Sequence, residues 1–203
     1  MSDTLNIIIV EDQTLVRDAL AQLLNLQSDI NVQASLKDGL EAQAFLQENT
    51  VDLVLSDIEM PGMDGLKLCE WITQHQPTSK VIIVTTYNRS GYLTRAVKAG
   101  ASGFVLKEVA VDELAEKIRK VAAGQKVFDS ELVLAGLQEQ DPLTEREREA
   151  LRLAEQGLSS AAIAEKMCLS EGTIRNYLSE CMSKLYAHSR IEAARTAREK
   201  GWL

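Results

Sequence analysis

The first part of the chain, up to Gly124, alternates between short apolar runs and longer stretches with one apolar face. The short runs are rich in β-branched residues and predict strands at Leu5–Val10, Ile30–Ala34, Asp52–Ser56, Lys80–Val84 and Gly103–Leu106. The longer stretches predict helices at Thr14–Leu26, Gly39–Glu48, Leu66–Gln74, Tyr92–Ala99 and Val111–Ala123. Runs this short and apolar are typical of strands that are buried on both faces. The alternation predicts an α/β fold, a (βα)5 doubly wound parallel sheet with right-handed crossovers.

The first and last of these helices each show an apolar stripe that is expected to pack on the sheet. The stripe of the first comprises Leu15, Ala19, Leu20, Leu23 and Leu24. The stripe of the last comprises Leu114, Ala115, Ile118, Val121 and Ala122. Two glycines, Gly100 and Gly124, follow predicted helices at the position where a residue with positive φ usually ends a helix.

After Gly124 the pattern changes, and the domains are predicted as 1–124, a linker at 125–141, and 142–203. A turn or two of helix is predicted in the linker at Ser130–Leu137, and residues 142–203 contain four short helical patterns. A capping box from Thr144 to Glu147 begins the first helix, and the second is predicted at Ser160–Met167. Ser170 is the predicted N-cap of the third helix, and a second capping box, from Ser189 to Glu192, begins the fourth. Two short helices joined by a tight turn predict a helix-turn-helix in a small all-α domain.

Composition limits the class of protein. Of 203 residues, 45% are hydrophobic, so the chain can build a core. No apolar stretch approaches the roughly 20 residues of a membrane span, and the N-terminus lacks the pattern of a secretory signal. The cysteines have no metal-binding spacing and are expected to be reduced thiols: Cys69, Cys168 and Cys181. We therefore expect a cytoplasmic protein with no membrane partner.

Charged side chains follow three of the predicted strands. Glu11 and Asp12 follow the first strand, Asp57 follows the third, and Lys107 follows the fifth. Because parallel sheets form their sites outside the carboxyl ends of the strands, these groups are expected to share one pocket. Three carboxylates and one ammonium suit Mg²⁺ together with a phosphoryl group.

The pocket has a predicted mechanism. Asp12, Asp57 and the main-chain carbonyl of Glu59 would hold Mg²⁺, while Glu11 would act through water. The metal would screen the negative charge of a phosphoryl donor, so that the Asp57 carboxylate can attack phosphorus.

Two further side chains are expected to face the new phosphate. Lys107 would pair with it as a point charge, and Thr85, at the end of the fourth strand, offers a hydroxyl. Acidic residues at such positions can instead serve only as caps of loops and helices. The coincidence of these groups at several strand ends favours the phosphoryl site.

These residues resemble the receiver domain of bacterial two-component response regulators over residues 5–123. The motif consists of Glu11-Asp12, Asp57-x-x-Met-Pro-Gly-x-Asp-Gly, Thr85 and Lys107. The resemblance implies that a sensor histidine kinase phosphorylates Asp57 with Mg²⁺ as cofactor, and that the chain is a regulator and not an enzyme. It also assigns Thr85 and Phe104 as switch residues, although an aromatic residue in a short strand is otherwise most often core. In such a domain, bulky Tyr87 is expected to slow hydrolysis of the acyl phosphate.

The third helix of the second domain has two distinct faces. Ile174, Leu178, Cys181 and Leu185 form one stripe, and the opposite side carries Arg175, Asn176, Ser179 and Ser183. Such a helix suits the major groove of DNA, where Arg contacts guanine and Asn contacts adenine. Periodicity alone also fits an ordinary amphipathic surface helix.

The second domain resembles the LuxR-type helix-turn-helix. The segments that carry the resemblance are Leu143-Thr144-Glu145-Arg146-Glu147, Gly157-Leu158-Ser159, Ile163-Ala164, Leu169 to Tyr177, and Arg190-Ile191-Glu192-Ala193. Together with the receiver, they place the chain in the NarL/FixJ class of transcription factors, and its Thr-Ile-Arg-Asn-Tyr and Glu-Lys-Gly-Trp-Leu segments most resemble the DesR-like branch. The resemblance implies promoter DNA as a partner, contact with RNA polymerase, and DNA contacts from Thr173, Arg175, Asn176, Ser179 and Lys184.

The distribution of charge sets an expectation for DNA affinity. Residues 1–140 carry 20 Asp and Glu against 12 Lys and Arg, whereas residues 141–203 carry ten of each. Because affinity for DNA depends strongly on neutralised phosphates, one monomer should bind weakly. We therefore expect a homodimer, formed on phosphorylation, that binds half-sites about one helical turn apart.

Two other classes of function fit parts of the sequence. A haloacid-dehalogenase-like phosphatase also uses a strand-end Asp nucleophile, with an acid two residues later, as in Asp57-Ile58-Glu59. That class expects Asp at the second position and leaves the C-terminal helices unexplained. A phosphorylation-dependent protein-interaction module is the other alternative, and the neutral charge of residues 141–203 is its best support.

Overall fold

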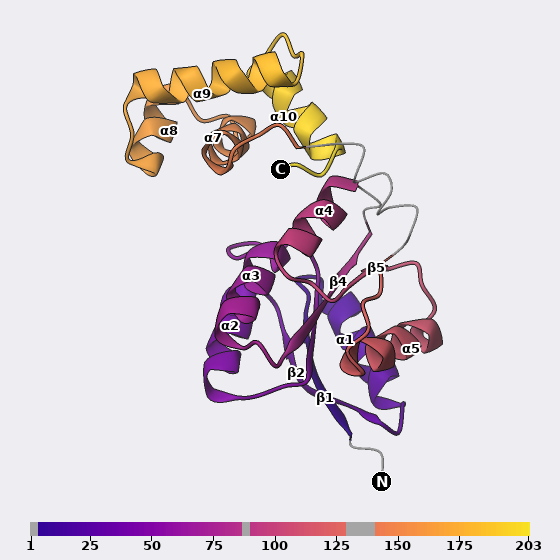
Figure 1. Cartoon of the computed structure of the whole chain (residues 1–203). Coiled ribbons are helices and arrows are strands. Elements are labelled where there is room, and N and C mark those ends of the chain that lie inside the picture. The colour runs from indigo at the N-terminus through magenta and orange to yellow at the C-terminus, as the bar shows by residue number, and fades with distance from the viewer. Residues whose placement is uncertain (1–3, 87–89, 129–140) are drawn as a thin grey trace. The chain divides into compact units, whose positions relative to one another are not determined.

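The computed structural model describes residues 4–86, 90–128 and 141–203 of the chain (Figure 1). These residues form two compact units, one built on a sheet and one all-helical, and each is described here by itself. The predicted turn at Ser130–Leu137, most of the predicted linker, and Tyr87 lie outside the described residues.

The first unit is a five-stranded parallel sheet, which confirms the predicted α/β class. Its strands are β1 Leu5–Val10, β2 Ile30–Leu36, β3 Leu53–Ser56, β4 Lys80–Thr85 and β5 Gly103–Leu106. They lie in the order β2-β1-β3-β4-β5. Val10 of β1 pairs with Ser56 of β3, so the carboxyl ends of these two central strands are level. This register places the residues after β1 beside those after β3.

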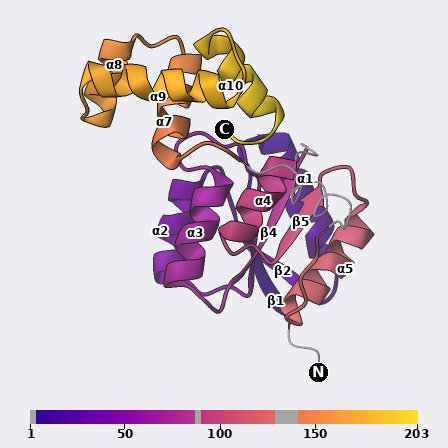
Figure 2. The ribbon, with the colours of Figure 1, turned by 45° about the horizontal axis from the view of Figure 1, so that its top comes forward.

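Five helices flank the sheet in the first unit. They are α1 Thr14–Asn25, α2 Gly39–Glu48, α3 Gly65–His75, α4 Ser90–Lys98 and α5 Val111–Ala122. Helices α1 and α5 lie on one side of the sheet, and α2 and α3 lie on the other, as Figures 1 and 2 show. The two-sided cover agrees with a doubly wound fold, and it leaves the carboxyl edge of the strands open for a site.

The prediction that every strand is buried on both faces is wrong for β2. In β3 every residue is buried, but in β2 buried or half-buried residues alternate with exposed ones. The reason is topological, because β2 is an edge strand and β3 lies at the centre of the sheet. An apolar run of five residues does not reveal that difference.

The predicted apolar stripe of α1 is wrong in part. Leu24 is fully buried and Leu20 packs against the core, but Leu15 is 83% exposed and Leu23 is 42% exposed. A helix can turn only one face toward a sheet, and here the face of Leu20 and Leu24 is the one that turns inward. Leu15, Ala19 and Leu23, spaced four residues apart, form a second apolar row that remains at the surface. In contrast, Leu114, Ala115, Ile118 and Val121 of α5 are buried as predicted.

The chain remains attached to the sheet after α5. Val127 forms a parallel bridge with Gly103 at the edge of β5. The amide of Phe104 donates to the Val127 carbonyl at 2.9 Å, and the Val127 amide donates to the carbonyl of Ser102 at 2.9 Å. The segment predicted to begin a linker therefore first pairs with the outer strand.

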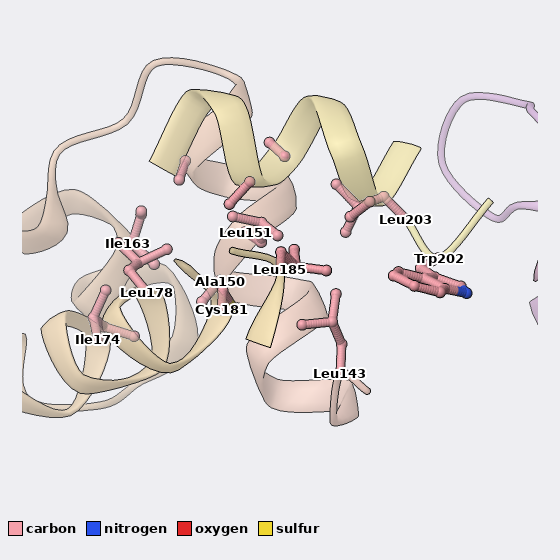
Figure 3. Packing of buried hydrophobic residues seen from close by; sticks show 14 of the residues in the cluster. Leu143, Ala150, Leu151, Ile163, Ile174, Leu178, Cys181, Leu185, Trp202 and Leu203 are labelled. Carbon is pink, nitrogen blue, oxygen red and sulfur yellow. The ribbon is translucent and has the colours of Figure 1, made fainter. Parts of the chain in front are cut away.

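The second unit consists, in its described part, of α7 Glu145–Glu155, α8 Ser160–Met167, α9 Glu171–Lys184 and α10 Arg190–Glu199. Its core is shown in Figure 3, where Ile174, Leu178 and Cys181 of α9 face Ala150 and Leu151 of α7. The buried stripe predicted for the third helix of this unit is thus confirmed. It fixes which side of α9 remains open to a partner.

Helix caps confirm most of the predicted boundaries in this unit. Thr144 and Glu147 form the reciprocal capping box at the start of α7, and the Ser170 hydroxyl accepts from the Thr173 amide. The predicted box at the start of α10 is wrong in one half. Ser189 accepts from the Glu192 amide, but the Glu192 carboxylate accepts from the amide of His188 instead of that of Ser189. The side chain reaches one residue further back along the loop.

Candidate functional site

The predicted acidic residues meet at the carboxyl edge of the sheet. We call Glu11, Asp12, Asp57 and Lys107 the acid pocket. One carboxylate oxygen from each of the three acids lies within 4.8 Å of the others. Within the described parts of the chain, this is the one cluster of His, Cys, Asp or Glu with the spacing of a metal site. Its donors are all hard oxygens, which fits Mg²⁺.

Lys107 closes the acid pocket from the end of β5. Its Nζ lies 2.7 Å from Glu11 Oε2 and 2.9 Å from Asp57 Oδ2, and its side chain is only 11% exposed. Asp57 Oδ1 accepts from the amide of Ile58 at 2.7 Å. Each carboxylate oxygen of Asp57 therefore has a donor that holds the side chain in place, and Lys107 joins the ends of β1, β3 and β5.

Burial dominates the electrostatics of the acid pocket. It raises the pKa of Asp57 and of Glu11 above their usual values, and the bonds to Lys107 offset only part of that rise. Burial also opposes the charge of Lys107, but its bonds to Glu11 and Asp57 outweigh this and raise the pKa of Lys107. In the acid pocket Lys107 therefore keeps its positive charge, whereas the carboxylates of Asp57 and Glu11 gain protons more easily than exposed carboxylates do.

We expect Mg²⁺ binding to the chain to weaken on acidification earlier than binding to exposed carboxylates would. A protonated carboxyl is a poor cation ligand, and the raised pKa values of Asp57 and Glu11 bring protonation to higher pH. The measurement is the Mg²⁺ dissociation constant of the full chain between about pH 7.5 and about pH 5. A dissociation constant that stays unchanged over this range would contradict the expectation.

The predicted switch residues, Thr85 and Phe104, occupy buried positions on the neighbouring strands β4 and β5. Thr85 ends β4 and is fully buried, and its carbonyl accepts from the Lys107 amide at 2.8 Å. Phe104 is 3% exposed in β5, opposite Ile83 of β4. Glu59 is half-buried in the loop after β3, and its main-chain carbonyl stays a predicted metal ligand.

A glycine that sequence reasoning passed over supports Asp57. A Cβ on Gly65 would lie 1.9 Å from the Asp57 carbonyl oxygen and 2.8 Å from Ser56 Oγ. The amide of Gly65 also donates to the Ile58 carbonyl at 3.0 Å. The start of α3 therefore rests directly on the backbone of Asp57. The signal was present in the Met-Pro-Gly-x-Asp-Gly segment, but nothing local showed that its last glycine touches the acid.

A second candidate site is the exposed side of α9 in the all-helical unit. The chain turns sharply between α8 and α9 at Cys168, which has a φ of 54°. Arg175, Asn176 and Ser179 are exposed, and Thr173 is half-buried against Ser170. The structure thus brings these four predicted DNA-contacting residues to the open side of one helix.

The two cations of α9 already have acidic partners. Arg175 lies 2.5 Å from Glu171 in an exposed pair, one turn earlier on the helix. Lys184 is 2.7 Å and 2.8 Å from the two carboxylate oxygens of Glu147, whose side chain is buried. Lys184 therefore serves to neutralise a buried acid, and a DNA contact from it would have to compete with this pair.

The cysteines are free thiols, with Cys69 and Cys181 buried and Cys168 exposed. No helix in the described ranges combines the length and the apolar character needed to span a bilayer.

The two units match two protein-family descriptions. Residues 7–119 match "Response regulator receiver domain", and residues 141–197 match "Bacterial regulatory proteins, luxR family". The chain is 44% identical over 199 residues to the transcriptional regulatory protein YvfU of Bacillus subtilis, covering 98% of this chain and 100% of that protein. It is 40% identical over 198 residues to the transcriptional regulatory protein DesR of the same organism, covering 98% of each.

A solved structure also resembles the whole chain. RcsB of Salmonella enterica serovar Typhimurium, bound to the promoter rprA with the phosphomimetic BeF3⁻, has a TM-score of 0.74 and 26% identity. The match covers 96% of this chain and 98% of that one. A structure of two RcsB dimers bound to two parallel DNAs matches with a TM-score of 0.64 and 26% identity, over 97% and 99% of the two chains.

Proposed function

Because the chain belongs to the response regulators that join a receiver domain to a LuxR-family DNA-binding domain, it is a DNA-binding transcriptional regulator, and we propose that phosphorylation of Asp57 switches it. The observation that carries the proposal is the acid pocket, in which three carboxylates converge within 4.8 Å beside Lys107. The phosphoryl donor is a sensor histidine kinase. The output is promoter binding through α9.

The proposed transfer uses Asp57 as the nucleophile. A carboxylate oxygen attacks the phosphorus of a phosphohistidine, so that an O–P bond forms as the P–N bond breaks, and the imidazole leaves with the bonding electrons and takes up a proton. Mg²⁺, held by Asp12, Asp57 and the Glu59 carbonyl with Glu11 acting through water, would supply the charge that offsets the repulsion between two anions. The bonds from Ile58 and Lys107 hold the nucleophile still.

The new phosphoryl group would change the bonding of the switch residues. Lys107, now shared between Asp57 and Glu11, would pair with phosphate oxygens, and the Thr85 hydroxyl would bond to them as Phe104 turns inward. Phosphate thus favours one of two pre-existing arrangements. A shift from 1% to 99% active needs about 5.5 kcal/mol, which phosphate contacts and dimer contacts would supply together.

We place the DNA interface on the open side of α9. Arg175 and Asn176 suit guanine and adenine edges, while Thr173 and Ser179 can contact the backbone or bases. The pairs Arg175–Glu171 and Lys184–Glu147 reduce the charge available for phosphates, which supports dimeric binding. RNA polymerase would then contact the DNA-bound dimer. The protein would act in the cytoplasm.

Two faces of the receiver are candidates for the dimer, the side of α1 and α5 and the side of α4 and α5, and an exposed apolar row supports the first. Leu15 and Leu26 are 83% and 78% exposed at the two ends of α1, and Leu23 is 42% exposed between them. Leucines exposed in one row on a receiver are costly unless they are covered in some state. We therefore favour the side of α1 and α5 over the side of α4 and α5.

The proposal is tested by phosphorylating the full chain with acetyl phosphate and Mg²⁺ and measuring promoter binding by electrophoretic shift at several salt concentrations. We expect one phosphoryl group per chain, a dimer by sedimentation, and an affinity about 5- to 150-fold higher than without phosphate. Equal affinity from a strictly monomeric form would contradict the switch. Salt-independent binding would contradict the phosphate contacts.

A matched variant separates phosphorylation and dimerisation from DNA binding. Asn176→Ala lies on the exposed side of α9, so it should accept phosphate and dimerise normally. It should lose about 1–3 kcal/mol of DNA binding free energy at sites with the cognate adenine.

The two alternative functions have less support. A phosphatase of the haloacid dehalogenase type finds no support in either matched family description. A partner protein in place of DNA is disfavoured because similar two-unit proteins were solved with DNA on them.

A further inference from the structure

Arg17 lies outside the acid pocket but touches the loop that carries two of its acids. Its Nη1 donates to the main-chain carbonyl of Glu11 at 2.7 Å, and its Nη2 donates to the Thr14 hydroxyl at 3.4 Å. Arg17 is half-buried at the end of the first turn of α1. One planar guanidinium thus joins the helix to the residue that precedes Asp12.

Helix α1 lacks the side-chain cap that α2 and α3 have. The N-cap residue of α1, Gln13, makes no side-chain cap bond, and the first turn contains no acid. Helices α2 and α3 of the same unit are capped by the carboxylates of Asp38 and Asp64. A cation near a helix N-terminus opposes the helix dipole, so helix stability alone does not favour an arginine there. The hydrogen bond to the Glu11 carbonyl offers a different reason for an arginine at position 17.

The same short loop has few other anchors. The Glu11 amide donates to the Leu36 carbonyl at 3.0 Å, and the Glu11 carboxylate accepts from the Gln13 amide at 3.1 Å. Both of these bonds are made by Glu11, the residue that directly precedes Asp12. Releasing the Glu11 carbonyl would free the backbone on which both acids are mounted.

We infer that Arg17 is a positioning residue for Mg²⁺, which holds the Glu11–Asp12 backbone so that both carboxylates are pre-arranged for the metal. The inference rests on the proposed function of the acid pocket and adds a residue to it. Groups behind the ligands of a metal commonly change its affinity by about 10- to 100-fold when they are replaced. Because Arg17 acts through a main-chain carbonyl, we expect the lower end of this range.

The charge of Arg17 has the opposite effect on a cation, and this separates the two explanations. A positive charge near the pocket repels Mg²⁺, so an electrostatic role alone predicts tighter binding when the charge is removed. Arg17→Lys keeps the charge but loses the planar fork that reaches two acceptors. Lys37 is the matched control, because it is an exposed cation that pairs with Glu41 at 2.7 Å.

The test is a titration of the full chain with MgCl₂, followed through the backbone amide signal of Ile58, which donates to Asp57. Arg17→Lys should weaken Mg²⁺ binding about tenfold, and Arg17→Gln, which also removes the repulsive charge, about threefold. Lys37→Gln should bind Mg²⁺ as tightly as the wild type or slightly more so. Without Mg²⁺, the melting temperatures of the Arg17 variants should stay close to that of the wild type. A purely structural role of Arg17 would instead lower them.

Other orders of affinity overturn the inference. If Arg17→Lys bound Mg²⁺ as tightly as the wild type, the planar guanidinium would not position the acids. If Arg17→Gln bound Mg²⁺ more tightly than the wild type, the only effect of Arg17 on the metal would be charge repulsion. If the wild-type chain showed no saturable binding of Mg²⁺, both this inference and the metal site of the proposed function would fall. Saturable wild-type binding with unchanged variants would remove the inference alone.

Discussion

Replacing Asp57 with Asn is expected to abolish phosphoryl transfer to the chain, both from a histidine kinase and from acetyl phosphate. An amide oxygen carries no full negative charge and is a far weaker nucleophile than a carboxylate. The substitution also removes one of the three acids that are grouped for the metal. The measurement is incorporation of labelled phosphate into the full chain in the presence of Mg²⁺. Genome-wide footprinting of Asp57→Ala against wild type should then show which promoters lose occupancy.

The loss should not come from unfolding. Because burial raises the pKa of Asp57, the folded chain binds a proton more readily than the unfolded chain. The charged carboxylate therefore costs folding free energy at neutral pH, and this cost disappears as the pH falls through the raised pKa toward the usual value. Asp57→Asn should be at least as stable as the wild type near neutral pH, and this margin should shrink in acid.

Asp52, at the opposite end of β3 from Asp57, provides a matched control. It precedes β3, is exposed, and accepts from the Asn6 amide at 2.8 Å, which an Asn side chain can also do. Asp52→Asn should be phosphorylated at the wild-type rate. Stable phosphate on Asp57→Asn, or loss of phosphate in Asp52→Asn, would place the acceptor elsewhere.

Replacing Arg148 with Met is expected to destabilise the all-helical unit by about 3–5 kcal/mol. The guanidinium is buried and donates to the Trp202 carbonyl at 2.6 Å, to Asp141 at 2.5 Å and to the Leu143 carbonyl at 3.2 Å. It also bonds to Glu145. Removing it leaves a buried carboxylate and two carbonyls without this donor, because the Asp141 side chain is only 9% exposed. Breaking a buried pair on one side is costly, whatever the intact pair contributes.

The experiment compares this variant with its neighbour on α7. Arg146 is 61% exposed and pairs with Glu149 at 3.2 Å, so Arg146→Met should change stability by less than about 1 kcal/mol. Denaturant unfolding of the full chain, with Trp71→Phe in the background, can be followed by fluorescence of Trp202. An unchanged midpoint for Arg148→Met would show that the cluster contributes little. Because α7 and α9 share one core, we expect this loss of stability to weaken DNA binding as well.

Several features of both units follow from local patterns along the chain. The β-branched runs predict the strands, and the acids after β1 and β3 follow from the rule that parallel strands end at one edge. The capping box at Thr144 and the buried stripe of α9 also depend only on residues a few positions apart. These features are readable because each depends on interactions within one turn or one strand.

Other residues could not be assigned without the fold. The hydrophobic positions of α1 allow two faces, and only packing on the sheet decides that Leu24 turns inward and Leu15 outward. The family resemblance implied a DNA contact from Lys184, but its ammonium pairs with the buried acid Glu147, which lies 37 residues away in the chain. Gly65 and Arg17 gain their roles from a carbonyl in another element or loop.

The sequence by itself determined the two-unit class and the order of strands and helices, and it indicated Asp57 as the candidate phosphoacceptor. These properties depend on the spacing of residue types along the chain and on the chemistry of neighbouring residues. Only the tertiary structure decided how the acids are held, which cations remain available to a partner, and why Arg148 is needed. The physical reason is that such roles depend on burial and on contacts between residues far apart in the chain, and no local pattern contains these quantities.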